Sequence, residues 1–142
     1  MKTSKEMLSS ILKTTQMGQI GIRSVLETSM RPGLRKALES QLHEYDAIET
    51  EAYAIASQRG WELPELDPAK RFLVDRTTRM KLNRRNTDSK IADMMIQGNT
   101  KGMIKGLKNL HQFPEQDGQV SILSQRLLDC ETANIRQMQG YL

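Results

Sequence analysis

The stretch ILKTTQMGQIGIRSVLETS, residues 11–29, has the spacing of one helix of a bundle with an unusual centre. At about 3.6 residues per turn, apolar side chains recur on one face at both ends of the stretch. Two polar side chains, Thr15 and Gln19, lie between them, and neither carries a charge. A bundle that binds metal ions would place a glutamate at this level. The fold and the function therefore depend on which residues the other helices place at the level of Thr15 and Gln19.

The composition suits one folded domain, residues 1–142. Charged residues make up 27% of the chain and hydrophobic residues 37%, which is too apolar for a disordered chain and too polar for a membrane protein. No apolar run approaches the roughly 20 residues of a membrane-spanning helix, and the first ten residues lack the apolar core of a secretory signal. The single cysteine, Cys130, fits a reducing compartment. We expect a cytoplasmic protein outside the membrane.

Helix start and stop signals divide the chain into four long helices. Thr3 and Glu6 have the spacing of a capping box, Pro32 suits a first helical turn, and Gly60 is typical of a helix end. Asp67 and Pro68 predict the start of a shorter helix. The expected long helices cover about 4–29, 33–59, 89–112 and 116–141, with a crossover over 61–88.

The loop lengths predict how these helices are arranged. Short loops make the first two and the last two helices antiparallel hairpins. The crossover is long enough to return along the bundle, so the second and third long helices can run parallel. This is the all-α, ferritin-like four-helix bundle with one long crossover. An up-down-up-down bundle with a long loop is the alternative.

A weak internal repeat relates the two halves. A shift of 84 residues places Gly18, Ile20 and Leu26 on Gly102, Ile104 and Leu110. A shift of 86 residues places Leu34, Leu42 and Ala52 on Val120, Leu128 and Met138. Such matches are common among amphipathic helices, so both duplication and chance stay open.

The residues at the expected metal level do not form a ferritin-like di-metal site. Such a site needs a glutamate from each of two helices and a Glu-x-x-His pair from each of the other two. The residues at these positions, in helix order, are Thr15 and Gln19, Tyr45 and Ile48, Asn99 and Met103, and Glu131 and Asn134. One carboxylate and no imidazole cannot hold two metal ions. We therefore expect no metal and no cofactor, with His43 and His111 at the surface.

The same positions predict a polar layer in the core. Its members are Thr15, Gln19, Tyr45, Asn99, Glu131 and Asn134. A buried polar group without a hydrogen bond costs roughly 1–3 kcal/mol, and these side chains could satisfy one another. The layer either fixes the register of the helices or lines a pocket for a small molecule or a single metal ion. Burial of Glu131 should raise its pKa.

Three glycines recur every four residues in GNTKGMIKG, residues 98–106: Gly98, Gly102 and Gly106. Each costs roughly 1 kcal/mol in a helix relative to alanine. We expect close packing against the second helix or the crossover to offset that cost.

The crossover is basic. Its arginines are Arg71, Arg76, Arg79, Arg84 and Arg85, and Asp75 is the acid among them. Clustered cations bind phosphate and gain from counterion release, so one interpretation is an acidic partner, either nucleic acid or protein. The other is a solvated helix face, because residues 70–85 hold one aromatic residue, Phe72, and no nucleic-acid motif.

Residues 6–64 resemble the spore coat protein F family of endospore-forming bacteria. The matching residues are Lys13-Thr14, Glu27-Thr28, Leu34-Arg35, Gln41-Leu42 and Gly60-Trp61, in this order. The resemblance implies a ferritin-like bundle, a place in or near the spore coat and no known catalytic residues.

These observations favour a non-enzymatic structural or interaction protein. Its expected partners are proteins, either copies of itself or coat proteins. The alternatives are a degenerate ferritin-like binder of a metal or small molecule, and a nucleic-acid binder that uses the basic crossover.

Overall fold

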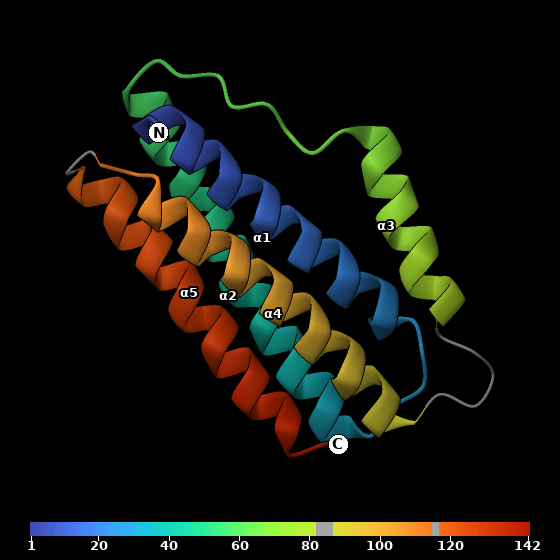
Figure 1. The fold of residues 1–142 in the computed structure, drawn as a ribbon. Helices are drawn as coiled ribbons and strands as arrows, with labels where there is room; N and C mark the ends of the chain where they lie inside the picture. Colours follow the sequence, from blue (N-terminus) through green and yellow to red (C-terminus); the bar gives the residue numbers. More distant parts are fainter. Residues whose placement is uncertain (82–86, 115–116) are drawn as a thin grey trace.

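A computed structural model describes residues 1–81, 87–114 and 117–142, and this part of the chain is all-α, as predicted (Figure 1). Its helices are α1 (Ser4–Leu26), α2 (Pro32–Gln58), α3 (Pro68–Lys81), α4 (Asp88–His111) and α5 (Gly118–Gln139). None of the helices in these ranges is both long and apolar enough to cross a lipid bilayer.

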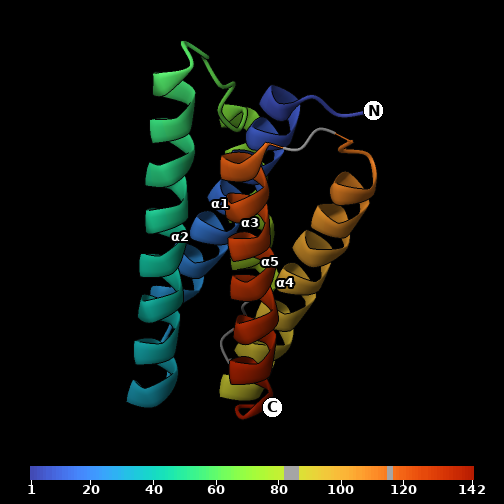
Figure 2. The same cartoon turned by 90° about the vertical axis from the view of Figure 1, so that its left-hand side faces the viewer.

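The four long helices pack as two hairpins, α1 with α2 and α4 with α5, and α1 also contacts α4 while α2 contacts α5. Ion pairs at the helix ends fix the directions. Arg31, before α2, pairs with Asp88, the first residue of α4, at 3.6 Å. Arg59, after α2, pairs with Asp117, before α5. Thus α2 and α4 run in the same direction, and Figure 2 shows α5 between them.

The predicted helix signals act as expected. Thr3 accepts a hydrogen bond from the backbone N–H of Glu6 at 3.1 Å. Gly60 adopts a left-handed conformation, with φ 67°, which an L side chain would strain. The backbone N–H of Trp61 then donates to Ala56 O at 2.9 Å and closes the end of α2.

Most predicted helix boundaries differ from the structure by one to three residues, and two of the differences have a clear local cause. α1 ends at Leu26, three residues before the expected end, because a tight turn starts there. The N–H of Thr28 donates to Val25 O at 2.9 Å, and Thr28 O accepts from the Arg35 guanidinium at 3.0 Å. α5 begins at Gly118 because Asp117 caps it.

The crossover returns along α1, and α3 packs on α1 outside the bundle (Figure 1). The crossover is held at both ends. Near its start, the backbone N–H of Leu66 donates to Gln16 Oε1 at 3.0 Å. Along α3, Ser24 donates a hydrogen bond to Asp75, and Arg79 pairs with Glu27. α3 is therefore placed as an extra wall beside α1 and α4.

Candidate functional site

A cavity of about 430 Å³ lies between α1, α3 and α4 and reaches the centre of the bundle. This volume is within the range of small-molecule sites, roughly 300–1,000 Å³. The apolar side chains in its walls are Met17, Ile22, Leu73, Val74, Met94 and Met95. The polar side chains at its inner end are Tyr45, Asn99 and Glu131.

Two glycines open the cavity on facing helices, Gly21 on α1 and Gly98 on α4. A Cβ atom added at either position would have no atom within 4 Å. Neither glycine therefore serves close packing. Their effect is to leave room between the helices where larger residues would fill it.

A hydrogen-bonded network forms one part of the inner end. The Tyr45 hydroxyl donates to Asn99 Oδ1 at 2.9 Å, and Asn134 Nδ2 donates to the same oxygen at 3.3 Å. Asn99 Nδ2 donates to Met95 O at 2.8 Å. Burial and the nearby Glu131 raise the pKa of Tyr45, so its hydroxyl keeps its proton. These three members of the predicted polar layer satisfy one another.

Glu131 is the exception at this level. Its side chain is 1% exposed and lines the cavity, and its Oε1 has no hydrogen-bond partner among the described residues. Burial raises its pKa to about 8, in the direction that the sequence predicts. The carboxyl group is therefore mostly uncharged at neutral pH and can both donate and accept a hydrogen bond.

Two central glycines make room for two side chains. A Cβ on Gly18 would lie 2.7 Å from Tyr45 Cζ. A Cβ on Gly102 would overlap Glu131 Oε2 and lie 3.0 Å from Glu131 Cδ. The shift of 84 residues relates the two glycines, and the shift of 86 relates Tyr45 to Glu131. The same contact thus occurs once in each half, which favours duplication over chance.

The glycines of α4 pack against different neighbours from those predicted. Gly102 faces Glu131 of α5 and Thr14 of α1, while Gly106 faces Leu128 of α5. The expected close packing against the second helix or the crossover is not found at these two positions. The spacing of the glycines predicts that one edge of the helix carries no side chains, but it cannot show which neighbouring residues pack there.

Thr15 and Gln19 do not join the network. The Thr15 hydroxyl donates to Ile11 O of its own helix at 2.8 Å. Gln19 Nε2 donates to Asp46 Oδ1 at 2.9 Å and to Glu49 Oε1 at 3.3 Å, both on α2. All six predicted residues are buried, but the expectation that they satisfy one another is wrong for Thr15 and Gln19. Thr15 bonds its own helix, and acids at the edge of α2 reach Gln19 in the seam between α1 and α2.

The basic crossover is partly neutralised. Arg79 pairs with Asp75 at 3.0 Å and also with Glu27. Arg76 is exposed and Arg71 is half-buried, while Arg84 and Arg85 lie outside the described residues. Glu27 could not be found among the acids of the crossover itself, because it lies at the end of α1 and meets Arg79 only through the docking of α3.

A wider hollow of about 840 Å³ lies on the surface between α2 and α5. Arg126 and Glu44 form an ion pair at 2.8 Å in its lining. Cys130 lies at its base, and burial raises the pKa of this thiol to about 12, which makes it unreactive at neutral pH. Gln41 of this groove also has a buried Oε1 without a hydrogen-bond partner among the described residues, although its Nε2 donates to Gln137 Oε1 at 2.8 Å. The inner cavity is the better candidate because it reaches the centre of the bundle and has apolar walls, whereas the groove lies on the surface.

Within the described ranges, no group of three or more histidine, cysteine, aspartate or glutamate residues could hold a metal ion. His43 and His111 are exposed. No protein-family model, curated protein or solved structure matches the chain. The geometry of the cavity therefore carries the functional interpretation.

Proposed function

We propose that this chain is a non-enzymatic binding protein that holds a small, mostly apolar molecule in the cavity between α1, α3 and α4. The observation that carries the proposal is the buried Glu131 side chain at the inner end of the cavity, whose Oε1 has no hydrogen-bond partner among the described residues. A buried polar atom without a partner costs roughly 1–3 kcal/mol. A hydrogen-bonding group on a bound molecule would recover that free energy.

The helix arrangement supports a ferritin-like class for this binder. Two antiparallel hairpins whose second and third long helices run parallel are the pattern of ferritin-like bundles with one crossover. Those bundles build their sites from inward side chains at the centre. We propose that an organic ligand site takes the place of the di-metal site here. The resemblance of residues 6–64 to coat protein F supports a place in or near the spore coat.

The lining of the cavity supports binding rather than catalysis. Its described side chains include no histidine or cysteine, and three methionines line it, Met17 on α1 and Met94 and Met95 on α4. Methionine adapts to ligands of irregular shape. Hydrolytic catalysis by a Ser–His or Cys–His pair needs those residue types, and the described lining of this cavity contains no serine, cysteine or histidine.

The test is titration with Nile red, a neutral apolar dye, followed by fluorescence. The variant Gly98→Leu puts a side chain into the open space of the cavity and should weaken binding by roughly tenfold or more, because it removes volume. Gly118→Leu is the matched control, since Gly118 also has open space at its Cβ position but lies at the start of α5, outside the cavity. Equal binding by both variants and the wild type would contradict the proposal.

Exposed apolar residues favour a second candidate function, protein interaction. Ile104 and Leu107, three residues apart on α4, are 47% and 44% exposed. Residues at this spacing share one helix face. We propose that this strip mediates self-association. Sedimentation velocity should show an oligomer for the wild type and a monomer for a variant with Ile104→Ser and Leu107→Ser. A wild type that sediments as a monomer at all concentrations would contradict it.

A further inference from the structure

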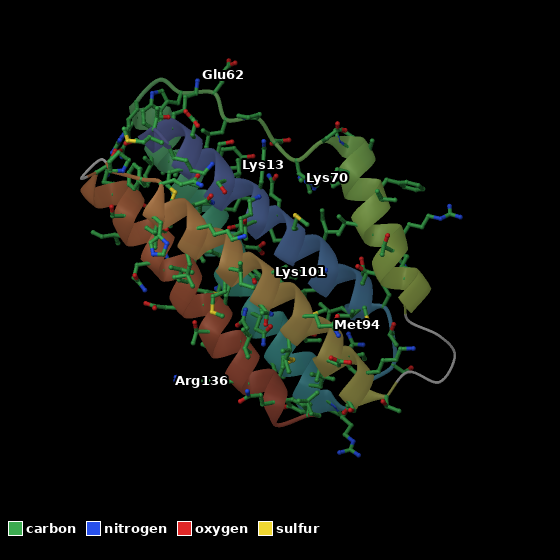
Figure 3. All side chains as sticks on the ribbon, viewed as in Figure 1. Lys13, Glu62, Lys70, Met94, Lys101 and Arg136 are labelled. Carbon is green, nitrogen blue, oxygen red and sulfur yellow. The ribbon has the colours of Figure 1, made fainter. Side chains whose placement is uncertain are left out.

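Two lysines of α4 line the cavity, and lysines of α1 and α3 lie near them. Lys101 and Lys105 of α4 line it directly. Desolvation lowers the pKa of Lys105, and the nearby ammonium groups of Lys70 on α3, Lys13 on α1 and Lys2 lower it further. Figure 3 shows Lys13, Lys70 and Lys101 on the same side of the molecule, on α1, α3 and α4.

These lysines have no acidic partner in the described part of the chain. The ion pairs found there are all made by arginines, which pair with Asp46, Asp88, Asp117, Glu27, Asp75 and Glu44. The one acid that lines the cavity, Glu131, lies buried at its inner end. The mouth of the cavity is therefore a cluster of like charges, and an anion placed there would relieve their repulsion.

We propose that the cavity binds a single-chain anionic amphiphile, with its apolar chain between α1, α3 and α4 and its anionic group among Lys13, Lys70 and Lys105. This inference rests on the proposed function and names its ligand class. The charge complementarity selects an anionic group at the mouth, and the methionine and glycine walls select an apolar chain. The uncharged Glu131 at the inner end adds no repulsion to either part.

A fatty acid fits this description better than a polyanion does. The cationic mouth opens onto an apolar space, which a nucleic-acid backbone would leave unfilled. A long-chain carboxylate uses both features at once. The same chemistry could come from a free fatty acid or from an anionic lipid in a bilayer, and the experiment separates these sources.

The experiment compares laurate with lauryl alcohol, which has the same chain without the charge, by calorimetric titration of the full chain. The test variant carries Lys13→Gln, Lys70→Gln and Lys105→Gln. The control variant carries Lys5→Gln, Lys36→Gln and Lys90→Gln, which remove the same charge away from the cavity lining. We expect the wild type and the control to bind laurate more tightly than the alcohol. The test variant should lose roughly tenfold in affinity for laurate and keep its affinity for the alcohol.

The outcomes separate the two proposals. Equal binding of laurate and alcohol by all three proteins would overturn the anionic-group assignment and leave the cavity as a neutral binding site. No binding of either compound would overturn both. Sedimentation of the wild type with phosphatidylglycerol vesicles, without binding of free laurate, would also overturn the proposal, because the lysines would then contact a membrane surface.

Discussion

The two halves of the bundle place a side chain against a glycine at the same level, but with opposite results. In the α1–α2 half, Tyr45 lies against Gly18 and its hydroxyl is satisfied by Asn99. In the α4–α5 half, Glu131 lies against Gly102, and its Oε1 has no hydrogen-bond partner in the described part of the chain. Both side chains lie at the inner end of the cavity, so the difference between them is in their hydrogen bonds. The Tyr45 hydroxyl already has a partner in the protein, whereas the carboxyl group of Glu131 is free to bond a ligand.

The largest effect should come from Glu131→Gln. Glu131 keeps its proton up to about pH 8 in the folded state and loses it near its ordinary pKa of 4.5 when unfolded. Between these values the folded state binds more protons, so the free energy of unfolding should fall as pH rises, by up to about 1.4 kcal/mol per pH unit. Glu131→Gln should remove this slope, be neutral or stabilising at pH 7, and have little effect near pH 4.

Urea unfolding between pH 4 and 9 measures this slope, with the exposed Glu39→Gln as the control. A wild type whose stability stays constant from pH 5 to 8 would contradict the buried, uncharged carboxyl. Destabilisation by Glu131→Gln in the presence of chelator would also contradict it, since that result requires a buried cationic partner for the carboxylate.

Alanine at the two equivalent glycines should have unequal effects. Gly18→Ala forces a Cβ against the buried Tyr45 ring, and overpacking of this kind costs about 1–3 kcal/mol. Gly102→Ala meets the end of the Glu131 side chain, which can move into the cavity, so it should cost less. Thermal melts of both variants make the comparison. A larger loss of thermal stability for Gly102→Ala than for Gly18→Ala would contradict this, because it would show that the Glu131 carboxyl group is held as rigidly as the Tyr45 ring.

The smallest expected effect is a gain in stability, from Gly98→Ala. Gly98→Ala adds a Cβ in open space on α4, so the ordinary helix preference for alanine, about 1 kcal/mol, should appear as added stability. A chemical denaturation curve beside that of Gly102→Ala, one turn away, measures it. Destabilisation by Gly98→Ala would mean that the backbone at this position is packed by something that the cavity geometry does not include.

The fold could be predicted from the sequence where one residue decides a local conformation. Examples are Thr3, Pro32 and Gly60, which act through their own backbone geometry or a nearby amide. Their roles can therefore be predicted from the sequence. The end of α1 was not predictable in this way. It depends on Arg35, seven residues further on, which donates to Thr28 O.

The site could be predicted only in part, because some of its contacts join residues that are far apart in the chain. Helical spacing placed Tyr45, Asn99, Glu131 and Asn134 at one level because they face the axis of the bundle. It could not assign Gln19, whose long side chain reaches acids on the edge of α2. The cavity depends on where α3 docks, and bonds such as that of Gln16 with Leu66 fix this docking across long stretches of chain.

The state of Glu131 can be observed by carbon NMR of protein labelled at the glutamate carboxyl carbon, with Glu131→Gln used to identify the resonance. The pH titration of this signal should have its midpoint near 8, since burial without a counter-charge disfavours the ionised form. A midpoint near the ordinary value of 4.5 would mean that the carboxylate is charged and solvated or paired. That result would contradict an uncharged group facing an apolar cavity at the centre of the bundle.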